Sequence, residues 1–234
     1  MTYTIQALEI GRRKADSALF LYLTDFGVEI EIAYRLWLLR GPAGLVVVDT
    51  GPPLEEAHRR GITNVREVDD ALAEAGVAAQ DVRTIVLTHL HWDHAGGLCR
   101  ADGSLAFPRA EHVIGAACLA HARSPAEKDA GSFRAPDVDL LLREGKVRLW
   151  QEGDPLAPGL TAYLSRGHTE GLLIPLVEAR DDGPPLAFPT DLVPTRSHLK
   201  PTWVMAYDNQ PVVSVAEKRA LFADLGRKCG GLVL

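Results

Sequence analysis

The chain has 234 residues, of which 47% are hydrophobic and 24% charged, so it can bury a substantial core. Its formal net charge of −6 argues against nucleic acid or an anionic membrane surface as a partner, because both favour a basic face. No secretory signal or membrane-spanning apolar run is evident, and the three cysteines are widely spaced. We therefore expect a cytoplasmic protein without a disulfide framework.

The N-terminal half predicts strands followed by a helix. Residues 19–51 predict three strands separated by turns, because apolar and acidic residues alternate over 28–32 and residues 41–44 read Gly-Pro-Ala-Gly. The apolar run 45–48 is typical of a strand covered on both faces. Residues 65–76 contain helix formers throughout and end in glycine, which predicts a helix.

Strands and helices continue to alternate along the rest of the chain. We expect a strand over 81–89 and a strand followed by a helix over 110–123. Further strands are predicted at 146–150, 160–167, 172–179 and 185–191, the last two joined by a turn at 180–185. A helix over 214–231, capped by Ser214 with Glu217 three residues later, precedes a final strand. This pattern predicts a layered α/β fold, one domain over 1–234, with helices outside two sheets.

The most informative stretch is residues 85–97, which read IVLTHLHWDHAGG. Its apolar start predicts a buried strand that delivers four polar side chains to one edge: His89, His91, Asp93 and His94. Imidazoles and carboxylates at this density are rarely structural, since both avoid burial unless they are paired or bound to a cation. Because neutral imidazole and carboxylate suit zinc, manganese, iron or cobalt, the stretch predicts a metal site.

This stretch resembles the HxHxDH motif of the metallo-β-lactamase superfamily. Other motifs of that family follow the same order here, namely Asp49 in VVVDTG, His168 in SRGHTEG and Asp191 in FPTD. The resemblance covers essentially the whole chain and implies an α/β fold of the four-layer αββα sandwich type. It also implies that Asp49 orients the metal site from behind the ligands. A turn aspartate bonding its own backbone is the alternative for Asp49.

The resemblance further implies two divalent metals, for which we expect zinc, with manganese, iron or cobalt as alternatives. One metal would be held by His89, His91 and His168, the second by Asp93 and His94, and Asp191 would bridge them. Such a pair generates a metal-bound hydroxide near neutral pH. Asp93 and Asp191 would therefore be catalytic as well, with Asp93 orienting the hydroxide and passing a proton to the leaving group.

The fifth motif of the family is a histidine after the last strand, and this sequence ends at Leu234, inside that strand. We therefore expect either a chain truncated at its C-terminal end or a weakly held second metal. His198, seven residues past Asp191, would substitute as a ligand or line the pocket, or it is a simple loop residue. The other histidines are expected at the surface: His58, His112 and His121.

Within the family, the sequence resembles the N-acyl homoserine lactonase-like, quorum-quenching branch. A tyrosine found in those lactonases three residues past the bridging Asp is replaced by Pro194, which leaves Tyr22, Tyr34 and Tyr207 as candidates for its task. We expect a partly apolar pocket lined by Trp92, Phe107, His198 and Trp203. No basic cluster lies near the motifs, apart from the modest exception of Arg196 and Lys200. Neutral lactones and esters are therefore favoured over polyanions.

The favoured function is a metal-dependent hydrolase of lactones or esters, possible substrates including N-acyl homoserine lactones. Three alternatives remain open, because the same fold and metal core serve all of them. They are a phosphotriester or phosphodiester hydrolase, an oxidative iron enzyme acting on a thiol or persulfide, and a non-catalytic metal-binding scaffold. The segment 25–41 would form either a homodimer surface or a lip over the substrate.

Overall fold

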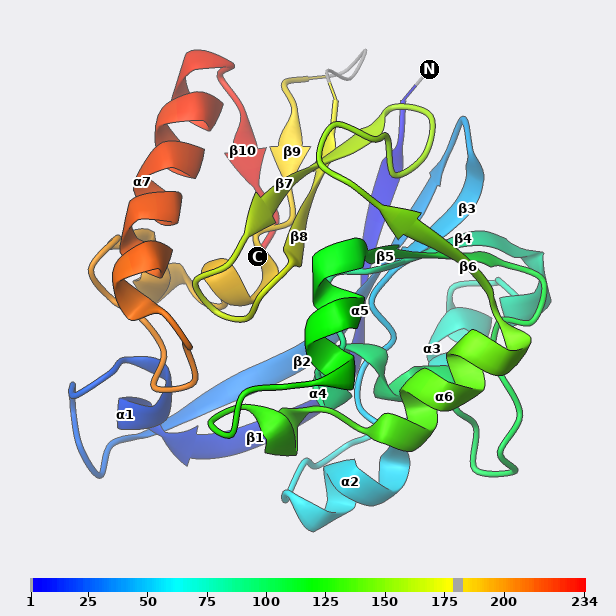
Figure 1. Cartoon of the computed structure of the whole chain (residues 1–234), viewed down its shortest axis with the longest axis horizontal. Coiled ribbons are helices and arrows are strands. Elements are labelled where there is room, and N and C mark those ends of the chain that lie inside the picture. The colour runs from blue at the N-terminus through cyan, green and yellow to red at the C-terminus, as the bar shows by residue number, and fades with distance from the viewer. Residues whose placement is uncertain (1, 179–182) are drawn as a thin grey trace.

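The computed structural model describes residues 2–178 and 183–234, which form two β-sheets with helices on their outer faces (Figure 1). The first sheet has the order β1 (Thr4–Asp16), β2 (Glu29–Gly41), β3 (Gly44–Val48), β4 (Val82–Leu87), β5 (Glu111–Gly115), β6 (Lys146–Trp150). The second has the order β10 (Gly231–Leu232), β9 (Leu186–Ala187), β8 (Leu172–Val177), β7 (Leu160–Ser165). The helices are α1 (Ser17–Phe20), α2 (Leu54–Arg59), α3 (Val68–Glu74), α4 (Trp92–Ala95), α5 (Ala116–Arg123), α6 (Ala135–Glu144) and α7 (Pro211–Arg227).

Alternation along the central strands sends neighbouring side chains into different apolar layers. Val47 packs into the core that the first sheet shares with α3, α5 and α6, whereas Val46 and Val48 face the second sheet. On the far side, Leu172 and Ile174 of β8 pack in a third cluster with residues of α7. Each such buried side chain stabilises the fold by about 1.5–3 kcal/mol. These layers confirm the predicted four-layer αββα sandwich, with α7 on one side and α3 and α6 on the other (Figure 1).

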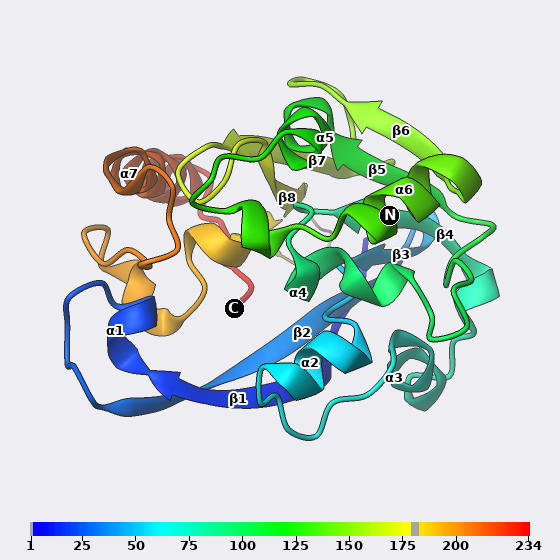
Figure 2. The ribbon, with the colours of Figure 1, turned by 60° about the horizontal axis from the view of Figure 1, so that its bottom comes forward.

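The strand directions place one edge of the first sheet beside the long β1–β2 hairpin. Strands β3, β4, β5 and β6 are parallel, so the segments that follow β3 and β4 emerge at the same edge. Strands β1 and β2 pair antiparallel over almost their whole length, but β3 reaches only residues 37–41 of β2. The rest of the hairpin projects beyond the sheet toward α1 (Figures 1 and 2).

The first of the three strands predicted within residues 19–51 is wrong, whereas β2 and β3 confirm the other two. The apolar residues at its start belong to α1 and a turn. Asp16 accepts hydrogen bonds from the backbone N–H groups of Ala18 at 2.9 Å and Gly27 at 3.0 Å, which caps the helix and closes the turn. The preceding strand, β1, was not anticipated.

Helix α7 begins at Pro211 rather than Ser214, because proline fits the first turn of a helix. Ser214 is fully buried inside the helix, where a Cβ on Gly167 would lie 2.3 Å from its Oγ. Glu217 does not complete a capping box but accepts hydrogen bonds from the backbone N–H groups of Arg166 and Gly167. The predicted turn at 180–185 lies partly outside the described residues.

Two smaller findings concern the chain as a whole. The three cysteines are free thiols, as expected for a chain without a disulfide framework. Across residues 2–178 and 183–234, we find no helix with the length and apolar character needed to cross a membrane.

Candidate metal centre

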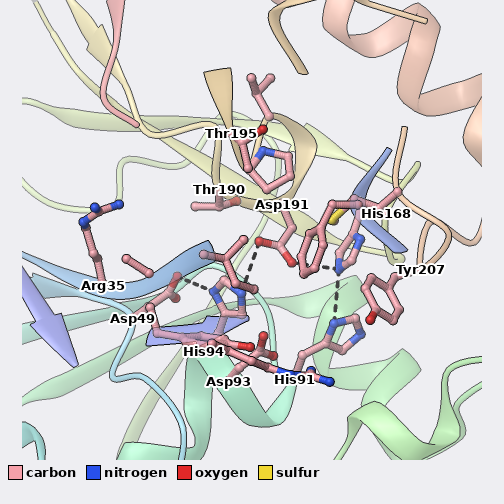
Figure 3. A pocket seen from close by; sticks show the side chains of 18 of the residues that line it. Arg35, Asp49, His91, Asp93, His94, His168, Thr190, Asp191, Thr195 and Tyr207 are labelled. Atoms are coloured by element: carbon pink, nitrogen blue, oxygen red, sulfur yellow. Dashed lines mark hydrogen bonds and ion pairs between the residues drawn. The ribbon is translucent and has the colours of Figure 1, made fainter. Parts of the chain in front are cut away.

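The polar motif lies at the carboxyl end of β4. That strand ends at Leu87 and α4 begins at Trp92, with the extended residue His91 as its N-cap. Asp93 and His94 fall in the first turn of the helix. The rapid change from extended to helical backbone lets His91, Asp93 and His94 all face one cavity (Figure 3).

Gly97 shows why glycines follow the motif. A Cβ at this position would lie 2.2 Å from the carbonyl oxygen of Thr50, which directly follows the loop residue Asp49. The Thr50 backbone N–H and hydroxyl donate hydrogen bonds to the His94 carbonyl at 2.7 and 3.0 Å. A larger side chain at 97 would therefore push α4 away from β3 and displace His94.

Nitrogen and oxygen atoms from both halves of the chain converge beside this motif. One ring nitrogen from each of His89, His91 and His168 lies within 4.8 Å of the others, and ligand atoms of His89, His94 and Asp191 form a second such group. The Nε2 atoms of His94 and His168 are each 3.3 Å from a carboxylate oxygen of Asp191, so this carboxylate connects the second group to His168 of the first (Figure 3). We call these five residues the metal cluster.

The metal cluster fits a divalent cation. Among the described residues, the buried Nε2 atoms of His89 and His91 have no hydrogen-bond partner, an arrangement that is costly unless a ligand satisfies it. Burial first, and neighbouring histidines second, hold the pKa of His89 well below its ordinary value, so its imidazole is neutral and able to bind metal. Although burial opposes it, the charges of His94 and His168 lower the pKa of Asp191, which keeps that ligand a carboxylate.

Three further side chains contact the cluster histidines from behind. Asp49 Oδ2 is 2.8 Å from His94 Nδ1, and Asp208 Oδ1 is 3.1 Å from His168 Nδ1. Thr88 Oγ1 is 3.1 Å from His89 Nδ1 and donates to Asp49 at 2.8 Å. Bonding one ring nitrogen fixes the tautomer and orientation of the imidazole, which leaves the other nitrogen for the cluster.

Asp208 was not predicted from the sequence, and Glu217 was predicted in a different role, as part of a capping box. Asp208 is 40 residues from His168 and lies in an irregular segment, where it is the single charged residue between 201 and 210. That isolation is the one sequence signal that points to it. Glu217 holds the loop before His168 through its bonds to Ser165 Oγ and two backbone N–H groups, an arrangement that only the packing of α7 reveals.

A cavity of about 210 Å³ adjoins the metal cluster, and Trp92 and Asp93 line it. Three other residues predicted to line the pocket do not. Phe107 is fully buried in the core beneath the first sheet, and Trp203 lies outside the cavity, beside Lys200. His198 is fully buried too, with both ring nitrogens already hydrogen-bonded, at 2.8 Å to Thr195 Oγ1 and at 2.7 Å to the Phe20 carbonyl. It is therefore no substitute ligand in this structure.

Of the three histidines predicted at the surface, two are exposed or half-buried and one is fully buried. His58 is exposed on α2, and His121 is half-buried on α5, where it lies 2.8 Å from Asp129. His112 is fully buried on β5, so its surface prediction is wrong, because a central parallel strand is covered on both faces.

The walls of the cavity carry charge that the sequence did not predict. Arg13, Arg35 and Arg60 line the cavity, whereas Arg196 and Lys200 are exposed elsewhere. We call these three lining arginines the cationic wall. The expectation that the site has no basic cluster, with Arg196 and Lys200 as the modest exception, is therefore wrong, because β1, β2 and the end of α2 bring distant arginines together.

The tyrosines and the segment 25–41 are also placed by the structure. Tyr34 and Tyr207 line the cavity together with Pro194, and Tyr22 does not. Five residues of β2 contribute to the same wall: Ile32, Ala33, Tyr34, Arg35 and Trp37. This strand therefore lies beside the cavity, as a substrate lip would.

A sequence model of the metallo-β-lactamase superfamily matches residues 35–220, and the chain belongs to that superfamily. N-acyl homoserine lactonase AttM of Azorhizobium caulinodans is 29% identical over 175 residues, which are 68% of this chain and 64% of the relative. Human acyl-coenzyme A thioesterase MBLAC2 is 29% identical over 154 residues, 58% of this chain and 51% of the relative. The matched part thus spans less than two thirds of either relative, and both are named as hydrolases.

Solved structures agree on the fold. A quorum-quenching N-acyl homoserine lactone lactonase superposes with a TM-score of 0.82 at 18% identity, covering 100% of this chain and 92% of that one. The dizinc quorum-quenching lactonase AidC, in complex with a product, gives 0.79 at 18% identity, covering 96% and 84%.

Proposed function

We propose that this chain is a metal-dependent hydrolase that opens lactones or cleaves esters, N-acyl homoserine lactones included. The observation that supports this most directly is the metal cluster, with its unsatisfied nitrogens at His89 and His91 beside an open cavity. Superfamily membership and the lactonase names of similar proteins favour hydrolysis of an acyl–oxygen bond. We further propose that the protein acts in the cytoplasm on a small molecule.

The first proposed ligand set follows one group of converging atoms, while the second takes His94 from the other group and adds Asp93 from the sequence motif. His89, His91 and His168 would hold one divalent ion, while Asp93 and His94 would contribute to a second, with Asp191 between them. Zinc is the proposed metal, because imidazole and carboxylate ligands suit it. When bound, such ions lower the pKa of a water molecule and polarise a carbonyl oxygen.

Asp93 is the proposed proton carrier. It lines the cavity beside the cluster, where burial raises the pKa of its carboxyl group, the charge of His94 opposes the rise and the charge of Asp191 adds to it. The water oxygen forms a bond to the carbonyl carbon, and the bond from that carbon to the leaving oxygen breaks. A proton from the water passes through Asp93 to the leaving oxygen, so the products are a carboxylic acid and an alcohol.

Tyr207 is the proposed hydrogen-bond partner of the substrate carbonyl, because Pro194 stands where the related lactonases have a tyrosine. It lies beside His91 and His168 (Figure 3), and 42% of its surface is exposed. Burial raises the pKa of Tyr207 above its ordinary value, so its hydroxyl remains a hydrogen-bond donor at neutral pH. Tyr34 is more enclosed, and burial raises its pKa well above the ordinary value.

The test combines elemental analysis with a substrate panel. We expect the purified chain to contain divalent metal and to hydrolyse N-hexanoyl homoserine lactone or an aryl ester, with activity lost on chelation and restored by metal. The variant His58→Ala, on the exposed face of α2, serves as the control that keeps both. A metal-loaded chain that cleaves paraoxon but no lactone or ester would overturn the proposal in favour of phosphotriester hydrolysis.

A further inference from the structure

The cationic wall contrasts with the rest of the molecule. The chain carries a net charge of −6, yet three arginines line the cavity beside the metal cluster. Arg13 and Arg35 come from the paired strands β1 and β2, and Arg60 directly follows α2. Positive charge is therefore gathered at one cavity by three separate segments.

Arg60 is held in a fixed position. Its guanidinium lies over the Trp92 ring at 4.4 Å from the centroid, and that ring is 6.2 Å from the ring of Tyr34. Glu56 forms ion pairs with both Arg60 and Arg59, so one carboxylate is shared between two cations. The stacking fixes the geometry of the guanidinium, and its charge is only partly balanced.

Arg13 has no such balance. Within residues 2–178 and 183–234, no carboxylate lies within ion-pair distance of it, whereas its neighbour Arg12 pairs with Glu9 and Glu31 on the opposite strand face. Alternation along β1 turns Arg13 toward the cavity, near the apolar side chains of Phe20 and Ile32. Water is scarcer beside such groups, so an unpaired guanidinium there attracts an anion more strongly than at an open surface.

The electrostatic neighbourhood agrees with this placement. Burial raises the pKa of Tyr34 and of Tyr207, and the charge of Arg13 opposes the rise in both cases. Arg60 acts on Tyr207 in the same direction. The two guanidinium groups are therefore close to the hydroxyls that face the reacting part of the cavity.

We infer that Arg13 and Arg60 bind an anionic group on the non-reacting part of the substrate, so that the preferred substrates are lactones or esters bearing a carboxylate or a phosphate. This inference rests on the proposed function and narrows its substrate class. It also reverses the expectation from sequence that neutral esters are favoured. Guanidinium groups suit both anions because their fork of N–H donors matches the paired oxygens.

A matched pair of substrates tests the inference in the metal-loaded full chain. N-adipoyl homoserine lactone ends in a free carboxylate, and N-hexanoyl homoserine lactone has the same length but ends in a methyl group. We expect kcat/KM to be about 10- to 100-fold higher for the charged lactone, mostly through KM, the usual scale of a charge-assisted hydrogen bond. A second pair, hexanoyl-coenzyme A and the neutral hexanoyl thioester of N-acetylcysteamine, tests in the same way whether a substrate that bears phosphate is preferred.

Three variants assign the effect to the wall. Arg13→Gln should abolish the preference and Arg60→Gln should reduce it, while hydrolysis of the neutral substrate persists. Arg12→Gln makes the same charge change one residue away on the opposite face and should keep the preference. Equal rates on charged and neutral substrates in the unaltered protein, or a preference that survives Arg13→Gln, would overturn the inference while leaving the proposed function standing.

A binding measurement separates the two failures. The ring-opened products N-adipoyl homoserine and N-hexanoyl homoserine differ only in the terminal charge, and calorimetry compares their affinities without turnover. Tighter binding of the adipoyl product that disappears in Arg13→Gln would support the wall even if no lactone were hydrolysed. Equal affinities, together with equal rates on the coenzyme A pair, would contradict it. A preference confined to the coenzyme A pair would identify phosphate as the anion.

Discussion

The metal cluster and the cationic wall face the same cavity but are held in different ways. His89, His94 and His168 each have a second ring nitrogen bonded to a neighbouring side chain, and all three lie in the buried or nearly buried part of the site. In the wall, Arg13 is half-buried and Arg35 exposed, and neither forms an ion pair among the described residues. Arg60 is the exception, because Trp92 and Glu56 hold it. A fixed cluster suits chemistry that superfamily members share, whereas the less firmly held Arg13 and Arg35 suit the recognition of a particular substrate.

The largest effect should come from the cluster. Replacing His168 by alanine removes a ring that faces both His91 and Asp191, so we expect loss of bound metal and a fall in kcat/KM of at least about 10³-fold, equivalent to several kcal/mol of transition-state stabilisation. Arg13→Gln should retain full metal content. Elemental analysis of both variants checks the contrast, and metal lost from Arg13→Gln would show that cluster and wall are not separable.

The next effect should come from Asp208, behind the cluster. Asp208→Asn keeps the size of the side chain but removes the charge 3.1 Å from His168 Nδ1. We expect metal affinity to fall about 10- to 100-fold, because the ring loses the partner that orients it. Competition with a chromophoric chelator measures this affinity. Asp102→Asn, at an exposed position, is the matched control, and equal affinities in the two variants would contradict the role of Asp208.

Tyr207 lies between the two regions and should have a smaller effect. Tyr207→Phe removes the hydroxyl proposed to contact the substrate carbonyl, so we expect kcat to fall about tenfold with KM and metal content little changed, the scale of one hydrogen bond. Steady-state kinetics on N-hexanoyl homoserine lactone measures it. Tyr22→Phe, outside the cavity, is the control; an unaltered kcat in Tyr207→Phe would transfer the role to Tyr34.

The metal cluster could be predicted from the sequence more completely than the cationic wall. Four polar residues at or beside the metal cluster stand in one short motif, since His89, His91, Asp93 and His94 follow one strand. Gly97 packs behind them. The wall has no such local pattern, because Arg13 and Arg60 are brought together by the β1–β2 hairpin and the end of α2. Local periodicity predicts strands and their edges, but contacts between distant segments depend on packing that it does not specify.

The hairpin was also where secondary structure was hardest to predict. An apolar run before residue 24 reads equally well as a strand or as a short helix, since both bury such residues. The deciding contact is the Asp16 carboxylate, which bonds Gly27 eleven residues later. Phe20, at the end of α1, lines the same cavity as the cationic wall. The segment that was wrongly predicted as a strand therefore helps to form that cavity.

The smallest predicted effect concerns His198, which donates a hydrogen bond to the Phe20 carbonyl and so holds Phe20 in place beside the cavity. Burial first, and the charge of Lys218 second, lower the pKa of His198 from 6.5 to about 4. Above pH 6.5 the ring is neutral in both states. As the pH falls from 6.5 toward 4, the unfolded chain takes up the proton first, so the free energy of unfolding decreases across that window.

His198→Gln keeps a donor for Phe20 but does not titrate. Between about pH 7.5 and 5.5 we expect the unaltered protein to lose about 1 kcal/mol more stability than the variant, as the linkage relation requires for this shift. Urea unfolding at both pH values measures the difference. Because the other buried histidines, His112 among them, are present in both proteins, their contributions cancel. Equal losses would mean that the pKa of His198 is not lowered in the folded protein, and would contradict the prediction.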